Sequence, residues 1–536
     1  MTTYRFRTRP YRHQKDAIRK MLRNGFGGAL LMEPRTGKTK TAIDYASILN
    51  QTEKINGVLV ICPARVMGVW VEEFYKHSPQ RFQIHVWDAR ERSYSSGRPK
   101  GIPDLMPGME LMVVITNFET FSKPGRKIMK KIKVMRFNPE TKKREQVEVE
   151  KWTGRYSQAN GRFKNRKLLR DWVKRMDDKV LGVIDESHKI KSSSGRASVM
   201  IVSMRELFRY RLLLTGTPIT KAKRSFDIYM QWQFLNPDRF KHVPTVNDFK
   251  HRYGRWAQKE WGEEYRGAKN MDELQRLMLM DSYMVKRDDC FDLPKQDVEI
   301  VEVDLKQSGS VYDQLATEMV AEIKTLIELK SLPHKPKEVR EEIRTIEASI
   351  AIVLRLRLRQ LTGGMATTDD GDVIRIGSEK SVAMRGKLEQ LFEHDEKAVI
   401  AAAFIPDLDE MEMIGADLGV PTFRLSGGVS RRHGDLQIAE FRKLNEPAIF
   451  VMQPQAGSLG IDLSTSSRML WYSLVDSWVD FKQANDRIAL SRRSTTFTYF
   501  LAKGTIDRVM FRALRTDGDV HNAIMTRPEA LLRGHN

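Results

Sequence analysis

A strand–loop–helix pattern near the amino terminus limits the possible folds of this chain more than any other feature. The apolar run GALLM, Gly28 to Met32, predicts a buried strand, and EPRTG then breaks the apolar pattern. In the next stretch, KTKTAIDYASIL, apolar residues recur at helical spacing, at Ala42, Ile43, Ala46 and Leu49. A strand that turns tightly into a helix presents backbone N–H groups and the helix N-terminus to a phosphate group.

The loop itself carries the residue types of a nucleotide site. Lys38 is predicted to reach the β- and γ-phosphates of ATP, and the Thr39 hydroxyl to ligate Mg²⁺. Gly37 lets the backbone approach the phosphate oxygens, and Thr36 precedes it in the same loop. The place of the first glycine of such loops is held by Met32, which can end a strand without a positive φ. The expected cofactors are ATP and Mg²⁺.

An acidic pair far downstream supplies a second half for this site. The apolar run Val180 to Ile184 predicts a strand that ends directly before Asp185 and Glu186. Asp185 is predicted to hold Mg²⁺, while Glu186 orients and deprotonates the attacking water. The alternative is an exposed acidic pair that starts a helix. Together with the GKT sequence, the pair favours metal-assisted phosphoryl transfer within one α/β domain.

The charge of the chain favours a polyanionic partner. The 536 residues carry a formal net charge of +22, with a pI near 9.7. Such an excess of Lys and Arg is typical of proteins that bind nucleic acid, although a basic surface without a specific partner is the alternative. The length predicts two or three domains.

The remaining bulk features point to a cytoplasmic protein. We find neither a membrane-spanning apolar run nor a signal-peptide pattern. The two cysteines, Cys62 and Cys290, are far apart, which supports neither a disulfide framework nor a zinc site. The expected location is the cytoplasm of a bacterial cell or of a phage-infected host.

The order of motifs resembles the superfamily 2 helicases and translocases, specifically their Swi/Snf-like branch. RPYRHQKDAI resembles the adenine-reading segment, with Gln14 as the expected adenine contact, and VICPARVMGVWVEEF and ITNFET resemble the motifs after the phosphate loop. DESHKIKSSSGRAS is similar to the DEAH-like acidic box, and LLLTGTPI to the motif that couples ATP state to strand grip. QWQFLNPDRF, the VKR…LP segment and RLRLRQLTGG resemble helical elaborations of the branch, and FRLSGG, QPQAGSLGIDLS and QANDRI its later motifs.

The resemblance implies an α/β fold with two RecA-like parallel-sheet lobes and helical insertions. The apolar runs AVIAAAF, PTFRLSG, AIFVMQ, RMLWYSL and TTFTYFLA recur between amphipathic stretches, which independently predicts a parallel sheet in the second half. We expect a first lobe over 1–220 with a basic hairpin insertion at about 122–178, and a helical region over 221–384. A second lobe over 385–515 and a tail over 516–536 follow. RLRLRQL alternates like a strand, but the resemblance favours a helix.

The resemblance also assigns roles to residues outside the phosphate loop. ATP is expected between the lobes, with Arg487 stabilising the γ-phosphate charge and Gln483 beside it. The residues expected to link phosphate state to nucleic acid are Thr116, Asn117, Thr215, Gly216 and Thr217 in the first lobe, and Gly457, Gly460 and Asp462 in the second. His188 is expected to hydrogen-bond across the cleft, and Trp232 and Phe234 to pack in a helical core.

The chain departs from the family after QANDRI. Members of this branch usually read DRxHRxGQ, whereas this chain reads DRIALSRRS, with Leu490 at the second arginine and Arg492-Arg493 at the Gly-Gln pair. Leucine has no group that can donate to a phosphate oxygen. Either one of the two later arginines takes over, or turnover depends on Arg487 alone, or hydrolysis is impaired.

The segment before the acidic box is the expected nucleic-acid contact. KIKVMRF and EQVEVEKW alternate with period two around NPETKK, which predicts a β-hairpin. Its basic residues are expected to neutralise phosphates, while the later aromatics Tyr156, Phe163 and Trp172 stack on bases. The alternative is a solvated hairpin whose aromatics fill a minor core. The expected contacts are Lys131, Lys133, Arg136, Lys142 and Lys143.

These features predict an ATP-dependent DNA translocase or helicase acting on duplex or branched DNA. Compact phage and bacterial proteins that act in recombination, fork repair or annealing are the nearest analogy. An RNA helicase, an ATP-gated nucleic-acid clamp that hydrolyses little, and the motor subunit of a restriction system are the alternatives.

Overall fold

The computed structural model describes most of the chain and divides it into two compact units. The described residues are 4–87, 101–122, 127–138, 143–156, 162–219, 225–259, 262–290, 296–331, 342–343, 345–347, 349–367, 372–457, 461–489, 491, 493–516, 520, 524 and 531–532. The first unit comprises Met1–Pro218, Ser225–Arg255 and Ala268–Cys290, and the second Ile219–Arg224, Trp256–Gly267 and Phe291–Asn536. In the part described, no helix has both the length and the apolar character needed to span a bilayer.

The first unit is built on a seven-stranded parallel sheet. Every residue of its strands β1, β2, β4 and β7 is buried, as expected for a parallel sheet covered on both faces. This burial explains why these strands are continuous apolar runs in the sequence. In spatial order the strands are β11 (Ser282–Val285), β1 (Gly27–Met32), β8 (Tyr210–Leu214), β7 (Val180–Asp185), β2 (Gly57–Cys62), β4 (Leu111–Asn117) and β3 (Phe82–Trp87).

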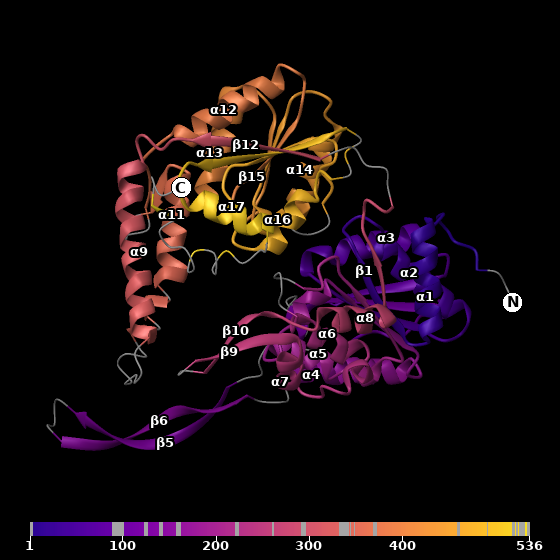
Figure 1. The fold of residues 1–536 in the computed structure, drawn as a ribbon. Coiled ribbons are helices and arrows are strands. Elements are labelled where there is room, and N and C mark those ends of the chain that lie inside the picture. Colours follow the sequence, from indigo (N-terminus) through magenta and orange to yellow (C-terminus); the bar gives the residue numbers. More distant parts are fainter. Residues whose placement is uncertain are drawn as a thin grey trace. The chain divides into compact units, whose positions relative to one another are not determined.

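Eight helices surround this sheet in the described part of the first unit (Figure 1). α1 buries Ala17, Ile18 and Met21 and ends at Gly25, whose φ of 78° is the left-handed conformation of a glycine cap. The helices are α1 (Arg12–Asn24), α2 (Lys38–Gln51), α3 (Met67–His77), α4 (Arg162–Arg175), α5 (Arg196–Val202), α6 (Asp227–Leu235), α7 (Val246–Tyr253) and α8 (Met271–Asp281). Trp232 and Phe234 of α6 are buried, which confirms their predicted packing role.

The second unit contains a six-stranded parallel sheet. All five apolar runs predicted as strands in the second half form strands of this sheet, and the two-lobed α/β prediction is confirmed. In spatial order the strands are β12 (Gln296–Val303), β19 (Thr495–Ala502), β18 (Arg468–Trp471), β15 (Ala398–Ala401), β17 (Ile449–Met452) and β16 (Thr422–Leu425). A short antiparallel pair, β13 (Met365–Thr367) and β14 (Val373–Arg375), lies outside the sheet.

Helices cover both faces of the second sheet. α12 and α13 share one core with residues such as Ile400 and Leu470, whereas α14, α16 and α17 pack in the opposite core around Phe450 and Met469. α11 confirms that RLRLRQL is helical. From the predicted tail, Val520, Ile524 and Leu531 are buried in the second of these cores. The helices are α9 (Gly309–Ser331), α11 (Arg355–Thr362), α12 (Glu379–Phe392), α13 (Ile405–Asp417), α14 (Arg431–Lys443), α15 (Pro454–Gly457), α16 (Trp478–Asn485) and α17 (Ile506–Thr516).

The region expected as a helical insertion, 221–384, is divided between the two units. Its earlier part supplies the edge strand β11 to the first sheet, and its later part supplies the edge strand β12 to the second. The stretch 221–384 is therefore not a separate helical region in this structure. Its two edge strands pair with strands far away in the sequence, which a local pattern does not show.

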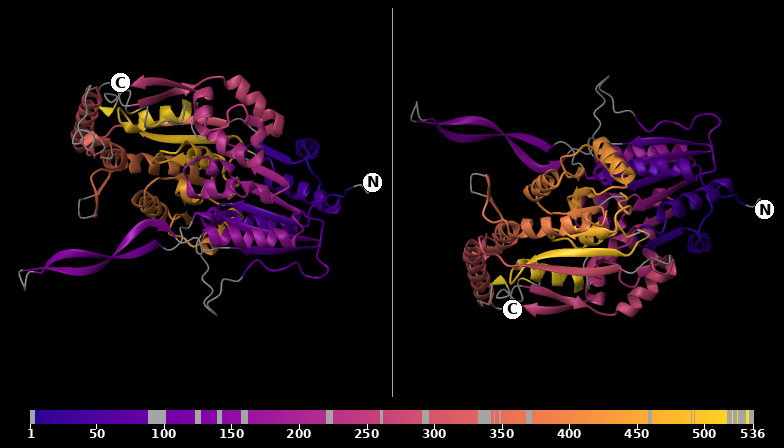
Figure 2. Two further views of the ribbon diagram at one scale, coloured as in Figure 1. Left: turned by 90° about the horizontal axis from the view of Figure 1, so that it is seen from below. Right: turned by 90° about the horizontal axis from the view of Figure 1, so that it is seen from above.

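Two hairpins complete the described structure. β5 (Lys127–Asn138) and β6 (Lys143–Tyr156) pair antiparallel, as KIKVMRF and EQVEVEKW predict. Figures 1 and 2 show this hairpin as a long arm that extends away from the sheet of the first unit. β9 (Gly254–Lys259) and β10 (Gly262–Ala268) form the second hairpin.

Candidate functional site

The phosphate loop connects β1 to α2 and is shaped by left-handed residues. Arg35 and Gly37 have φ angles of 68° and 85°, and α2 begins at Lys38. A Cβ at Gly37 would overlap the amide nitrogen of Gln14, so this position needs glycine for both conformation and space. The N-terminus of α2 thus follows a loop with the backbone geometry of a phosphate site.

Gln14 stabilises this loop from α1. Its Nε2 donates to the Thr36 carbonyl at 3.2 Å, and its Oε1 accepts from the Tyr11 backbone N–H at 3.0 Å. His13 adds a contact of 2.8 Å from Nε2 to the same Thr36 carbonyl. Gln14 is buried, so in this structure its amide supports the loop, and its contact with adenine stays a prediction.

Lys38 lies along the loop. Its Nζ donates to the carbonyls of Met32 at 2.8 Å and Glu33 at 3.3 Å. Charged phosphate oxygens are stronger acceptors for an ammonium group than neutral carbonyls, so these contacts leave Lys38 suited to bind a phosphate. Thr39 lies in the first turn of α2, and the Thr36 hydroxyl donates to the Glu33 carbonyl at 2.8 Å.

The acidic pair lies at the carboxyl end of β7, two strands from β1. Asp185 is the last residue of β7, and Glu186 has a left-handed φ of 53°. Asp185 Oδ1 accepts the Glu186 backbone N–H at 2.9 Å, and its Oδ2 accepts the indole N–H of Trp70 at 2.9 Å. Trp70 comes from α3 and was missed by sequence reasoning, although a buried indole usually has a hydrogen-bond acceptor.

The electrostatics of this pair suit a divalent cation. Burial raises the pKa of Asp185 to about 6, and the neighbouring Glu186 carboxylate adds to the effect, whereas Trp70 and Lys38 oppose it. A cation bound to Asp185 would favour its ionised form. Mg²⁺ is usually held by one or two carboxylates together with substrate phosphates and water. Asp185 can provide the carboxylate, and the Thr39 hydroxyl can provide a further oxygen ligand. The part of the chain that the structure describes holds no cluster of three His, Cys, Asp or Glu ligands. The residues present therefore fit Mg²⁺ bound together with ATP.

The Thr215–Thr217 turn follows β8, between β1 and β7. Thr215 Oγ1 accepts the Thr217 backbone N–H at 3.0 Å, and the Thr215 N–H donates to the Leu30 carbonyl at 3.2 Å. Gly216 approaches the phosphate loop so closely that a Cβ would lie 2.9 Å from Pro34 Cδ. The turn predicted to couple ATP state to nucleic acid is thus in van der Waals reach of the phosphate loop.

His188 joins the acidic pair to this turn. Its Nδ1 lies 3.2 Å from Thr215 Oγ1 and 3.3 Å from Glu186 Oε2. Both of these partners belong to the first unit, and the expected hydrogen bond across the cleft stays a prediction. The contact forms because the short helix η3 (Ser187–Ile190) follows β7 while the turn follows the neighbouring β8.

A second connection between the acidic box and the turn runs through α6. The Ser187 hydroxyl donates to Gln231 Oε1 at 2.7 Å, and Gln231 Nε2 donates to the carbonyls of Pro218 at 2.8 Å and Asp227 at 2.9 Å. Ser187 and Gln231 are fully buried. Sequence reasoning missed Gln231, one of two amides within the apolar run IYMQWQFL, because the sequence does not show which of the two is buried.

Thr116 and Asn117 are engaged inside the first unit. The Thr116 hydroxyl donates to the Trp87 carbonyl at 2.7 Å, and Asn117 Oδ1 accepts the Thr120 backbone N–H at 3.0 Å. Both residues are fully buried. Their side chains fix the turn after β4, and their role toward nucleic acid stays a prediction.

In the second unit, Arg487 lies against the segment that carries Asp462. Its Nη1 donates to the Ile461 carbonyl at 3.3 Å, and its carbonyl accepts the Leu463 N–H at 3.0 Å. Gln483 is buried in α16, and Gly457 ends α15. The motifs QANDRI and QPQAGSLGIDLS therefore contact each other through Arg487. Gly460, Leu490 and Arg492 lie outside the described residues, whereas Arg493 is exposed.

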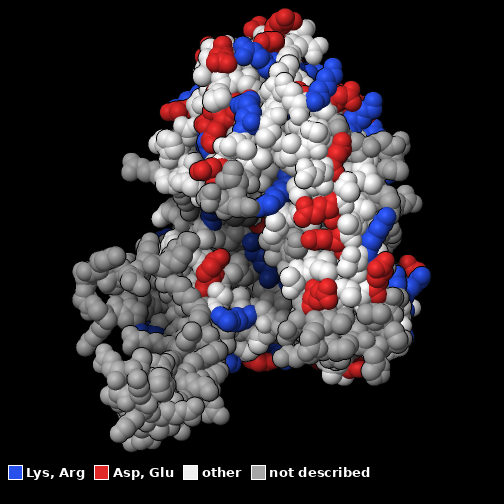
Figure 3. Space-filling view, turned by 90° about the vertical axis from the view of Figure 1, so that its left-hand side faces the viewer, with Lys and Arg blue, Asp and Glu red and all other residues white. Residues whose placement is uncertain are grey.

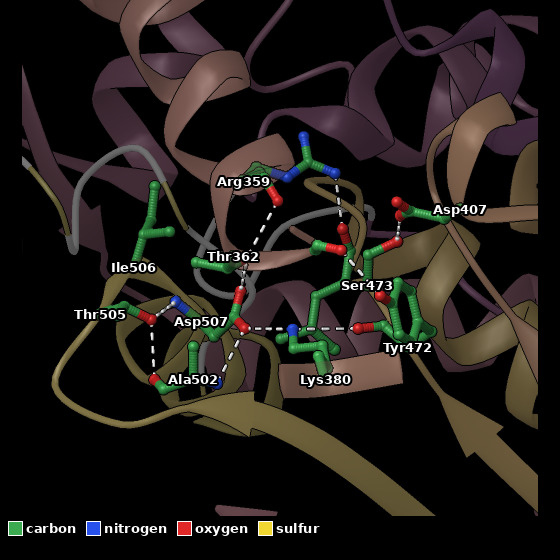
Figure 4. A network of polar contacts seen from close by, with 12 residues as sticks. Arg359, Thr362, Lys380, Asp407, Tyr472, Ser473, Ala502, Thr505, Ile506 and Asp507 are labelled. Atoms are coloured by element: carbon green, nitrogen blue, oxygen red, sulfur yellow. Dashed lines mark hydrogen bonds and ion pairs between the residues drawn. The ribbon is translucent and has the colours of Figure 1, made fainter. Parts of the chain in front are cut away.

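Helices outside these motifs hold the loop between β18 and α16 (Figure 4). Lys380 of α12 lies between Asp507 and the Tyr472 carbonyl, at 2.6 and 3.1 Å. The Ser473 hydroxyl donates to Asp407 of α13 at 2.5 Å, and Arg359 of α11 donates to the Leu474 carbonyl at 2.5 Å. None of these side chains was predicted from the sequence, because their partners lie far away along the chain.

The register of the β5–β6 hairpin refines the predicted nucleic-acid contacts. Lys131, Lys133 and Arg136 stand directly opposite Glu150, Glu148 and Glu145, whereas Lys130 stands opposite Lys151. Opposite charges on facing residues stabilise a ladder and like charges destabilise it. Lys143 begins β6, and Lys142 lies outside the described residues. The register therefore pairs Lys131, Lys133 and Arg136 in the middle of the hairpin with acidic residues.

Charges of both signs are interspersed on the described surface. Figure 3 shows Lys and Arg side chains next to Asp and Glu side chains over much of the face drawn there. The net charge of +22 is thus not expressed there as a single basic patch.

Comparison with known protein families identifies the family of this chain. A model of the SNF2-related domain matches residues 13–347, and a model of the helicase conserved C-terminal domain matches residues 383–490. The chain belongs to the SNF2-related family. The two matches span the phosphate loop, the acidic pair and the Arg487 segment, and they confirm the Swi/Snf-like resemblance.

SNF2-related proteins of known name are similar over most of this chain. The ISWI chromatin-remodeling complex ATPase CHR11 of Arabidopsis thaliana is 23% identical over 92% of the chain and 41% of its own length. An uncharacterized ATP-dependent helicase of Mycoplasma genitalium, MG018, is 22% identical over 92% of the chain and 40% of its own length. The chain thus spans about two-fifths of the length of these relatives. Human DNA annealing helicase and endonuclease ZRANB3 is 22% identical over 66% of the chain and 30% of its own length.

One solved structure is similar over almost the full chain. The Sulfolobus solfataricus SWI2/SNF2 ATPase core in complex with dsDNA aligns over 99% of this chain and 96% of its own, with 20% identity and a TM-score of 0.38.

Proposed function

We propose that this SNF2-related protein is an ATP-dependent DNA translocase or helicase that acts on duplex or branched DNA. One observation carries the proposal: within one sheet, the phosphate loop and the acidic pair are both connected to the Thr215–Thr217 turn. Such a connection lets the state of the bound phosphate bias a second binding surface.

The first unit provides the groups for hydrolysis. Lys38 binds the β- and γ-phosphates at the N-terminus of α2, and Thr39 with Asp185 holds Mg²⁺. Mg²⁺ neutralises the charge that develops on the phosphate oxygens. Glu186 orients the attacking water and accepts its proton, and the contact of 3.3 Å with His188 fixes the carboxylate. The Trp70 indole fixes the other carboxylate.

The second unit supplies the positive charge for the transferred phosphoryl group. Arg487 is proposed as that group, because a guanidinium can donate two parallel hydrogen bonds to phosphate oxygens. Its contact with the Ile461 carbonyl joins it to the Asp462 segment, which we propose as the nucleic-acid-responsive part of this unit. Opening and closing of such a site during turnover would move one unit along a strand, about one step per ATP.

DNA is the proposed partner, on two grounds. The net charge of +22 favours a polyanionic partner. Several SNF2-related relatives have names that state an activity on DNA, including the DNA annealing helicase and endonuclease ZRANB3. The β5–β6 hairpin is the proposed accessory contact, with phosphates neutralised chiefly by basic residues that do not face glutamates. Remodelling, branch migration, annealing and unwinding are the proposed uses of this motor.

Two other functions are distinguishable. An RNA helicase of the same superfamily would prefer single-stranded RNA, since the 2′-OH is the discriminating group. An ATP-gated clamp that hydrolyses little is favoured by Leu490, which cannot donate to a phosphate oxygen.

Displacement of a third strand from a DNA triplex tests translocation directly. We expect ATP-dependent displacement on a duplex that carries a triplex, and none by Glu186→Gln or with a non-hydrolysable ATP analogue. Displacement that needs binding but not hydrolysis would favour the clamp. ATP turnover stimulated by RNA alone would favour the RNA helicase.

A further inference from the structure

The loop that leads into α16 is held by one nearly fully buried arginine from another helix. Arg359 of α11 donates from Nη1 to Asp476 Oδ2 at 2.6 Å and from Nη2 to the Leu474 carbonyl at 2.5 Å. Its guanidinium also lies over the Phe404 ring, 4.9 Å from the centroid. The side chain therefore fixes both the backbone and a carboxylate of the same three-residue loop.

Burial of the Arg359 guanidinium is not explained by its contribution to the stability of the fold. Arg359 is only 6% exposed, and its partner Asp476 is about one-third exposed, so the guanidinium loses more hydration than the carboxylate. A buried ion pair is weak support for stability, because desolvation offsets the attraction. Among the described atoms, Nε of Arg359 has no hydrogen-bond partner. Residues that break the usual rules of burial without an evident gain in stability often serve a site.

The loop held by Arg359 sets the start of α16. Asp476 directly precedes Ser477, the N-cap of α16, whose hydroxyl accepts the Asp480 N–H at 3.2 Å. α16 ends at Asn485, and Arg487 follows two residues later. At about 1.5 Å per residue, the distance from the N-cap to Arg487 is on the order of 15 Å along a rigid helix. α16 therefore connects the loop held by Arg359 to the segment that carries Arg487.

The two ends of α16 are held by different parts of the second unit. At the far end, the Trp471 indole donates to Asn485 at 2.8 Å, and Trp471 belongs to the sheet itself. At the near end, the loop is held by Arg359, by Lys380 through the Tyr472 carbonyl, and by Asp407 through Ser473 (Figure 4). Of these three, Arg359 contacts the residues closest to the N-cap. Arg355 of α11 makes a longer ion pair with the same Asp476, 3.5 Å from Nε to Oδ1.

We propose that Arg359 is a positioning residue for ATP hydrolysis, which acts by fixing the Leu474–Asp476 loop and, through α16, the position of Arg487. The inference rests on the proposed role of Arg487 at the γ-phosphate. It adds a group from α11, a helix outside the phosphate-binding motifs, to the residues on which turnover depends.

The test combines single and double substitutions with single-turnover ATP hydrolysis in the presence of duplex DNA, which resolves slow rates. Arg359→Met keeps an unbranched side chain of similar length and removes the fork of donors. We expect it to lower the hydrolysis rate by about 10- to 100-fold, because small misplacements of a reacting group have effects of this size. The ATP concentration at half-saturation should change by less than about twofold, since the phosphate loop is intact.

The double variant separates positioning from a general structural role. Arg487→Ala should lower the rate by about 10³-fold or more. If Arg359 acts through Arg487, then Arg359→Met with Arg487→Ala should be no slower than Arg487→Ala alone. Rates that multiply in the double variant would overturn the proposal, as would a normal rate for Arg359→Met.

Two further variants complete the test. Arg359→Lys keeps the charge but not the paired donors, and we expect no rescue. Arg357→Met is the matched control, because this arginine lies two residues away on another face of α11 and lines a pocket with Val311 and Leu315. Arg357→Met should retain the wild-type rate, and an equal loss there would assign the effect to α11 as a whole and overturn the proposal. Full activity of Arg487→Ala would instead contradict the proposed function of that arginine.

Discussion

The Ser187 hydroxyl donates a 2.7 Å hydrogen bond to the amide oxygen of Gln231, and both residues are fully buried in the first unit. Gln231 in turn donates to the carbonyl of Pro218, directly after the Thr215–Thr217 turn. One amide therefore joins the acidic box to the turn that approaches the phosphate loop. His188 makes a second, independent connection between the same two segments.

We predict that Gln231→Leu lowers DNA-stimulated ATP hydrolysis more than basal hydrolysis, because it releases the turn without touching Lys38 or Glu186. The substitution leaves the Ser187 hydroxyl and the Pro218 carbonyl without this partner, at about 1–3 kcal/mol each in free energy of unfolding. Ser187→Ala in the same chain should recover part of that loss. Urea denaturation and ATPase assays measure both effects, and simple additivity of the two substitutions would contradict the connection.

Trp70→Phe is expected to raise the Mg²⁺ concentration needed for half-maximal hydrolysis. The indole N–H is a donor to Asp185 Oδ2, and loss of a group that orients a metal ligand typically costs 10- to 100-fold in affinity or activity. Titration of Mg²⁺ at saturating ATP measures the shift. Trp172 is fully buried, so its expected stacking on bases is wrong and the alternative of a core residue holds. Trp172→Phe is the matched control, since Trp172 is as buried as Trp70 and its indole has no partner among the described residues. An equal effect of both substitutions would show that ring volume matters and the hydrogen bond does not.

The hairpin prediction concerns the salt dependence of DNA binding. Deletion of Lys131–Lys151 should weaken DNA binding and flatten its dependence on salt while leaving ATP binding intact, since each phosphate contact contributes about 0.9 to the slope. Within the hairpin, Lys130→Gln with Lys151→Gln should flatten the slope more than Lys131→Gln with Lys133→Gln. The latter two lysines face glutamates in the ladder. An unchanged slope after the deletion would refute the hairpin as a DNA contact.

Asp407 gives the second unit a dependence on pH. Burial raises the pKa of this carboxyl to about 7, with Lys380 and Arg359 opposing the shift and Asp507 adding to it. The folded state therefore keeps a proton that the unfolded state loses near pH 4. Stability contributed by this group is present below about pH 4 and is lost as the pH rises toward 7, by on the order of 1 kcal/mol per pH unit. Asp407→Asn should flatten the fall in Tm between pH 5 and 8, and an identical pH profile would contradict this account.

The sequence predicted the elements that are buried on both faces. β1 and β7 are apolar runs because parallel strands bury both sides, and the motifs at their ends follow from that position. The edge strands were harder to predict. β11 has only four residues and pairs with β1 from about 250 positions away, and β12 (QDVEIVEV) alternates like a solvated strand.

Only those parts of the candidate site that depend on neighbouring residues in the sequence could be predicted. The sequence correctly places Lys38, Asp185 and Glu186 at the ends of strands or the loops after them, because an apolar run and the residues that follow it are local features. Their chemical roles stay predictions. Trp70, Gln231 and Arg359 were not predicted, because each acts through a hydrogen bond to a residue at least 44 positions away. The register of the hairpin also required the structure, since it decides which lysines face glutamates.

Steady-state ATP hydrolysis by the full chain tests the central claim most directly. It would be measured alone and with duplex, forked and single-stranded DNA and with RNA, with Glu186→Gln as the blank. We expect strong stimulation by duplex or forked DNA, which would also show that Leu490 is tolerated. ATP binding without turnover on any of these nucleic acids would contradict a DNA motor and favour the clamp.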